Sequence, residues 1–71
     1  MAETVDARGL SCPVPVIMAK KALDRIAAGE LIVLVDEEVA MENVSRLARS
    51  LKCSVDVVEE SGEFTLAIRK V

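Results

Sequence analysis

Two prolines at the head of an apolar-periodic segment are the strongest constraint on how this chain folds. They stand in the run Cys12-Pro13-Val14-Pro15. Proline is tolerated in the first turn of a helix, where its missing N–H has no partner, but it disrupts the helix interior. The sequence therefore predicts that a helix begins at Pro13, with Cys12 at the N-cap position.

This predicted helix start gives the thiol of Cys12 an unusual environment. The sulfur would face the positive end of the helix dipole and backbone N–H groups that have no partner within the helix. Such surroundings favour the thiolate, which is the nucleophilic form of cysteine. Free cysteine is also among the most buried residue types, so a packed thiol is the competing interpretation. Because the two prolines fix the helix start, we favour a reactive thiol at Cys12.

Hydrophobic patterning divides the chain into six short elements. We expect a strand from Thr4 to Ala7, a helix from Pro13 to about Ala28, a strand over 31–35, a helix over about 38–51, a strand over 53–60 and a last strand over 64–68. This order, βαβαββ, predicts an α+β fold, namely a two-layer α/β sandwich with both helices on one face of a four-stranded mixed sheet. Both β-α-β crossovers should be right-handed. Because no linker is visible, residues 1–71 are expected to form a single domain.

Turn and cap residues punctuate these elements. The Arg8–Gly9 pair predicts a turn in which Gly9 adopts a positive φ. Gly29 is the residue type expected just after a helix end, and Ser61-Gly62 predicts a tight hairpin turn. The acidic run 36–38 suits the positive end of the second helix dipole.

The first helix has two different faces. One contiguous stripe should pack on the sheet; it consists of Val16, Ala19, Ala22, Leu23 and Ile26. The opposite side mixes apolar and basic residues: Val14, Ile17, Met18, Lys21 and Arg25. A patch of this kind beside Cys12 could dock a partner protein. The alternatives are that loops cover these side chains, or that they are ordinary isolated exposed apolar residues.

Composition excludes several classes of site. The chain has two cysteines and no histidine, so it offers neither a Cys-His catalytic pair nor a four-ligand Cys/His zinc site. The N-terminus lacks a signal-peptide pattern, and no apolar run approaches the ~20 residues of a membrane span. We therefore expect a soluble cytoplasmic protein that does not associate with membranes. The net charge of −3 argues against a dedicated nucleic-acid binder.

Cys53 begins a segment of alternating hydrophobicity, on the same predicted face as Val55 and Val57. A buried core thiol is therefore the favoured interpretation. A reducing compartment disfavours a permanent Cys12–Cys53 disulfide, although the sequence leaves such a bridge open.

The residues around Cys12 resemble a known signature. It reads Asp6-Ala7-Arg8-Gly9-Leu10-Ser11-Cys12-Pro13-Val14-Pro15-Val16, followed by Lys20-Lys21-Ala22-Leu23. The match is to the TusA/SirA/YedF family of small sulfur-carrier proteins, and the resemblance runs through the whole chain. The segment from Val35 to Val44 is similar to the YedF-like branch, which is associated with selenium metabolism. Where family members commonly have glycine after the second helix, this chain has Lys52, which would be strained at positive φ.

The resemblance implies a βαβαββ sandwich and a carrier-type sulfurtransferase rather than a self-sufficient enzyme. Cys12 would accept sulfane sulfur from a cysteine desulfurase or a rhodanese-like donor, hold it as a persulfide and pass it to a downstream acceptor. Routes in the family lead to tRNA thiolation, molybdenum-cofactor synthesis and sulfur oxidation. Arg8, Gly9, Pro13 and Pro15 would shape the site, with no cofactor and no metal.

Four other functions are compatible with parts of the sequence. The fold resembles the C-terminal domain of translation initiation factor three, which suggests an RNA-binding module, but the acidic balance and lack of aromatic residues oppose it. A thiol redox regulator or selenium accessory protein would also use Cys12. A structural dimer could form through Val14, Ile17 and Met18, whereas the carrier interpretation favours a monomer.

Overall fold

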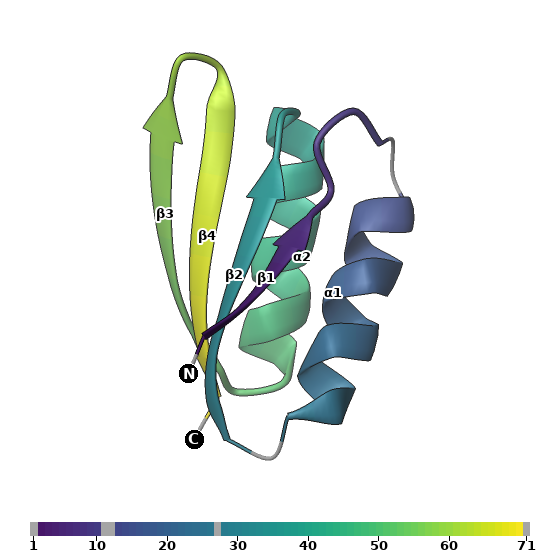
Figure 1. The fold of residues 1–71 in the computed structure, drawn as a ribbon, viewed down its shortest axis with the longest axis vertical. Coiled ribbons are helices and arrows are strands. Elements are labelled where there is room, and N and C mark those ends of the chain that lie inside the picture. The colour runs from purple at the N-terminus through teal and green to yellow at the C-terminus, as the bar shows by residue number, and fades with distance from the viewer. Residues whose placement is uncertain (1, 11–12, 27, 71) are drawn as a thin grey trace.

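The protein forms a two-layer α+β sandwich in the predicted order βαβαββ. The computed structural model describes residues 2–10, 13–26 and 28–70. Its elements are β1 (Ala2–Asp6), α1 (Val14–Arg25), β2 (Gly29–Val35), α2 (Glu38–Ser50), β3 (Ser54–Glu60) and β4 (Glu63–Lys70). Figure 1 shows both helices on the same face of the sheet. The predicted fold class is confirmed.

The sheet is mixed, with strand order β1-β2-β4-β3. β1 pairs with β2 in parallel, and β4 pairs antiparallel with both β2 and β3. The β3–β4 hairpin closes through Ser61 and Gly62, both at positive φ (53° and 78°), as the tight turn requires. The parallel pair brings the carboxyl ends of β1 and β2 to one edge of the sheet.

The core lies between the sheet and the two helices. Alternate residues of the central strands point toward the helices and are fully buried, among them Leu31, Val33, Leu66 and Ile68. The helices meet this layer mainly through alanines and branched aliphatic residues: Ala19, Ala22, Leu23, Ala40, Val44 and Ala48. Small side chains let the helices approach closely, so a dense core forms with Phe64 as its one aromatic residue.

The predicted limits of the first helix were wrong at both ends. α1 begins at Val14, and Pro13 occupies the cap position with φ −96° and ψ 12°. The helix ends at Arg25 rather than near Ala28, because Ile26 is already extended (φ −101°, ψ 133°). Gly29 is therefore not a helix-ending residue but the first residue of β2, where its φ is +131°.

The side chain of Lys70 caps the C-terminal end of α1, a contact that the sequence analysis did not predict. Its Nζ donates hydrogen bonds to the carbonyl oxygens of Leu23 (2.7 Å) and Ile26 (2.9 Å). Helix ends leave carbonyls without partners, and a cation there also interacts favourably with the helix dipole. A side chain from the last strand thus stabilises the C-terminus of the first helix.

The end of α2 is held by its own backbone. The Lys52 N–H donates to Arg49 O and the Cys53 N–H to Ala48 O, both at 2.9 Å, which is the pattern of a Schellman motif. Lys52 adopts φ 62°. This residue therefore has the positive φ that is strained for residues other than glycine, as the sequence analysis considered.

β3 is covered by the helices at one end only. Cys53 is buried and Val55 is half-buried, but Val57 is 38% exposed. Val55 and Val57 do share one face, as expected, because they pair with the buried Ile68 and Leu66 of β4, but the helices leave Val57 uncovered. Because β3 is an edge strand, its middle lies beside a hollow next to α2 rather than under a helix.

Replacing Lys70 with methionine should lower the free energy of unfolding by about 1–2 kcal/mol, since the aliphatic stem is kept while the charged donor is lost. Urea unfolding followed by circular dichroism measures this change. Lys20→Met is the matched control, because Lys20 is exposed and its side chain forms no hydrogen bond or ion pair with the described residues. Equal stability of the two variants would contradict the capping role.

Candidate functional site

The loop that leads from β1 toward Cys12 is tied to the sheet. The Ala7 N–H donates to Leu34 O at 2.8 Å, which extends the β1–β2 ladder past the end of β1, and Ala7 is fully buried. The Leu10 N–H returns to Ala7 O at 3.3 Å. Gly9 lies inside this turn at φ +80°, which confirms the predicted positive φ and explains why glycine is favoured there.

Asp36 anchors the same loop from the neighbouring strand. Its Oδ2 accepts a hydrogen bond from the Gly9 N–H at 2.9 Å. Asp36 follows β2 directly, and β1 and β2 are parallel, so their carboxyl ends meet at one edge. From the sequence we assigned Asp36 only a role at the helix dipole. The signal for this second role was its position directly after a strand parallel to β1.

Arg8 is held by a bidentate ion pair within the loop. Its Nε and Nη2 donate to the two carboxylate oxygens of Asp6 at 2.9 and 2.8 Å, and its backbone N–H also donates to Asp6 at 3.2 Å. Its Nη1 reaches Glu63 at the start of β4 at 3.4 Å. The guanidinium therefore joins the loop to the β3–β4 hairpin, and its charge is neutralised locally.

These hydrogen bonds change the acidity of Asp6. The side-chain and backbone donors of Arg8 stabilise the carboxylate and lower the pKa of Asp6 from 3.8 to about 2. The same contact with Asp6, together with Glu63, raises the pKa of Arg8. Both groups are solvent-exposed, so the pair sets the geometry of the loop more than it adds stability.

Cys12 and Ser11 lie outside the described residues, so the reactive thiol of Cys12 remains a prediction. The expected N-cap position of Cys12 was wrong, because Pro13 occupies the cap of α1 and Cys12 precedes it. The structure describes the residues that flank Ser11 and Cys12, namely Leu10 and Pro13. Leu10 ends the anchored loop, and Pro13 precedes the first turn of α1. In that turn Pro15 has no N–H, and the helix has no side-chain cap among the residues that the structure describes.

The expected docking face of α1 is only partly exposed. Val14 and Ile17 are 42% and 47% exposed, and Lys21 is also on the surface. Met18 departs from the expectation, because it is half-buried and packs against the core. Arg25 is exposed but is paired with Glu3 at 3.1 Å. The apolar and basic residues that remain are Val14, Ile17 and Lys21, and a docking role for them remains a prediction.

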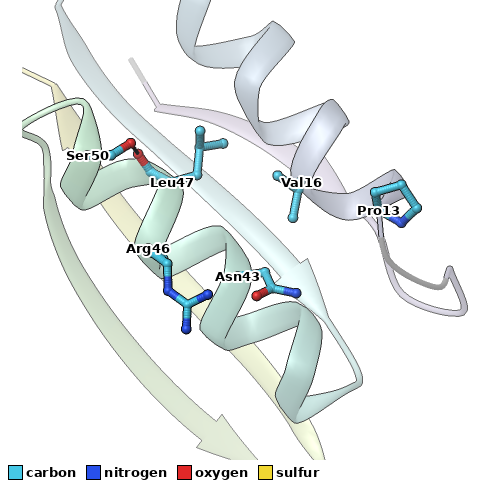
Figure 2. Close-up of a pocket in the computed structure, with 6 residues that line it drawn as sticks. All are labelled: Pro13, Val16, Asn43, Arg46, Leu47 and Ser50. Carbon is cyan, nitrogen blue, oxygen red and sulfur yellow. Dashed lines mark hydrogen bonds between the residues drawn. The ribbon is translucent and has the colours of Figure 1, made fainter.

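A groove between the two helices was not foreseen. Pro13 and Val16 line it from the α1 side, and Asn43, Arg46, Leu47 and Ser50 line it from α2 (Figure 2). Its volume is about 490 Å³. Sequence periodicity assigns Val16 to the buried stripe, yet this residue is only half-buried. The groove depends on how two helices lie side by side, which a pattern within one helix does not report.

The second cysteine, Cys53, is buried. Cys53 is a free thiol with 7% exposure, and its Sγ lies 3.8 Å from Leu51 O. The interpretation of a buried core thiol is confirmed. Within the described ranges, no three His, Cys, Asp or Glu side chains gather in a way that could hold a metal ion. None of the helices in this part of the chain has the length and apolar character needed to cross a membrane.

Removing the Asp36 carboxylate should free the loop. Asp36→Ala leaves the Gly9 N–H without its acceptor, so amide hydrogen exchange at Gly9 should accelerate and the protein should lose about 1 kcal/mol of stability. Asp36→Asn, which keeps an acceptor oxygen, should show a smaller effect. Glu37→Ala is the neighbouring control; unchanged exchange at Gly9 in Asp36→Ala would refute the anchor.

The Asp6–Arg8 pair should remain formed in moderately acidic solution. Since the folded-state pKa of Asp6 is lowered to about 2, its stabilising contribution is complete above the unfolded value and is lost as the pH falls through about 2. A carboxyl-carbon NMR titration should place the midpoint well below 3.8 in the wild type and near 3.8 in Arg8→Gln. A wild-type midpoint near 3.8 would show that the pair does not persist in solution.

Comparison with known proteins places these features in a family. The sequence model described as "Sulfurtransferase TusA" matches residues 3–70. A protein of Methanocaldococcus jannaschii named "Putative sulfur carrier protein" is 40% identical over 68 residues, which cover 93% of this chain and 91% of that protein. "Sulfur carrier protein TusA" of Allochromatium vinosum is 29% identical over 70 residues, 96% of this chain and 92% of that protein.

A solved structure extends the similarity to the fold. The SirA-like protein from Desulfitobacterium hafniense superposes with a TM-score of 0.89 at 33% identity, covering 97% of this chain and 96% of that one. The family match spans nearly all the residues, and it includes the anchored loop, the Cys-Pro-Val-Pro run and both helices. The chain therefore belongs to the TusA/SirA family of sulfur-carrier proteins.

Proposed function

We propose that this protein carries sulfane sulfur as a persulfide on Cys12. The observation that supports this most directly is the anchored loop. Hydrogen bonds to Leu34 and Asp36 hold residues 7–9 at the carboxyl edge of the parallel strands, three residues before the cysteine. A carrier needs its nucleophile on a positioned segment, and it needs no acid–base pair of its own, because donor and acceptor proteins provide theirs.

The transfer step conserves oxidation state overall. The Cys12 thiolate attacks the outer sulfur of a persulfide on a donor protein, such as a cysteine desulfurase or a rhodanese-like protein. The bond between Cys12 Sγ and that sulfur forms, the donor's S–S bond breaks, and the donor cysteine leaves as a thiolate with the electron pair. An acceptor thiolate then attacks the outer sulfur on Cys12 and regenerates the free thiolate.

The burial of Cys53 supports a carrier over a redox regulator within this chain. A reversible intramolecular disulfide needs a second accessible thiol, and Cys53 packs in the core with 7% exposure. Exposed Val14, Ile17 and Lys21 support transient docking of donor and acceptor around Cys12. Steering by Lys21 would weaken as salt concentration rises.

The downstream route is a further part of the proposal. tRNA thiolation, molybdenum-cofactor synthesis and related sulfur trafficking all need the same persulfide on Cys12. The YedF-like character of residues 35–44 supports a selenium accessory role as the second candidate. Competition between polysulfide and selenodiglutathione for Cys12, followed by mass spectrometry, separates the two, because the thiolate can attack the zero-valent selenium while a glutathione thiolate leaves with the electron pair.

Incubation with a cysteine desulfurase and cysteine, and separately with inorganic polysulfide, should add one sulfur atom to the intact protein. Cys12→Ser should abolish the addition, because it removes the attacking thiolate. Cys53→Ser is the matched control and should load as the wild type does. Loading that persists in Cys12→Ser but disappears in Cys53→Ser would overturn the assignment of the carrier residue.

A further inference from the structure

The groove between α1 and α2 is lined by both apolar and polar side chains. Pro13, Val16 and Leu47 supply the apolar surface, and Figure 2 shows Val16 and Leu47 between the two helices. Asn43, Arg46 and Ser50 line it from α2. The groove begins at Pro13, the residue that follows Cys12, so an occupant would lie directly beside the proposed carrier site.

Arg46 stands out among the arginines of the chain. Arg8, Arg25 and Arg69 each form an ion pair with an acidic side chain, at distances between 2.8 and 3.4 Å. Arg46 and Arg49 form none with the acidic residues in the described part of the chain. Of these two, only Arg46 lines the groove between the helices.

Glu42, one helical turn before Arg46, does not form an ion pair with it. Glu42 lies four residues before Arg46 on α2, a spacing that permits a pair on one helix face. Glu42 and Arg46 both line a second hollow of about 280 Å³ beside β3, yet they form no ion pair in the structure. In a chain with twelve acidic residues and a net charge of −3, this leaves a guanidinium available to a carboxylate from outside.

We propose that this groove binds an extended segment of the protein that exchanges sulfur with Cys12. An apolar side chain of that segment would lie over Val16 and Leu47, and a nearby carboxylate would pair with Arg46. Arginine binds carboxylates with two parallel hydrogen bonds, and an adjacent apolar surface keeps water from competing. The shape of the groove and the charge of Arg46 favour such a segment, and only the role of the partner rests on the proposed function.

A second copy of this chain is the alternative occupant. Its exposed Val58 is followed by Glu59 and Glu60, so it carries an apolar and acidic segment of its own. However, β3 of one copy in the groove of another joins two different surfaces, and such contacts tend to propagate rather than close into a dimer. A partner protein of acidic and apolar character therefore fits the groove better.

The test is an NMR titration of the ¹⁵N-labelled protein with the capped peptide acetyl-Leu-Glu-Leu-Glu-amide. The amides of Val16, Asn43 and Leu47 should shift. Affinity should fall about fivefold in Arg46→Gln, and about as much for the peptide with glutamine in place of glutamate, because a charge-assisted pair is lost. Arg49→Gln removes the same charge one turn away and should bind as the wild type does. Glu42→Gln should bind slightly more tightly.

Several results would overturn the groove as a docking site. These are shifts confined to Val14, Ile17 and Lys21, the absence of shifts, or equal losses in Arg46→Gln and Arg49→Gln. Concentration-dependent self-association in sedimentation that Arg46→Gln abolishes would assign the groove to a second copy instead. Polysulfide loading of Cys12 and peptide binding, both measured on the wild type, separate the two proposals. Loading without peptide binding removes only the groove, and peptide binding without loading removes only the carrier function.

Discussion

The parallel pairing of β1 with β2 is the constraint on which the anchored loop before Cys12 depends. Parallel neighbours end at the same edge, so the turn after β1 meets the residues that end and follow β2. Leu34 and Asp36 then accept hydrogen bonds from Ala7 and Gly9. An antiparallel pair would place the end of β2 at the far edge, and the cysteine segment would leave the sheet without these anchors.

Charge pairing adds a second attachment to the same edge. Arg8 contacts Asp6 within the loop and Glu63 at the start of β4, so the loop is connected to both halves of the sheet. The pairs are exposed, and exposed pairs contribute little to stability. Their value is geometric, because a bidentate guanidinium fixes orientation as well as distance. Arg46, by contrast, forms no ion pair with the acidic residues of the described ranges.

The sequence allowed prediction of the features that depend on local periodicity. The element order, the sheet-facing residues Leu66 and Ile68, the turn at Gly9 and the buried thiol of Cys53 all follow from alternation, helical spacing or turn chemistry. The end of α1 could not be predicted in this way, because Lys70, more than forty residues away, binds its last carbonyls. The roles of Asp36 and the groove also depend on which elements become neighbours.

The two ends of the chain have a practical consequence. β1 starts and β4 finishes at the edge of the sheet opposite the loop that precedes Cys12 (Figure 1). A purification tag, fluorophore or additional domain fused near Ala2 or Lys70 would thus start about one strand length away from the loop that precedes Cys12. Attachment at the start of β1 or at the end of β4 would therefore leave the loop of residues 7–10 facing away from a sensor surface.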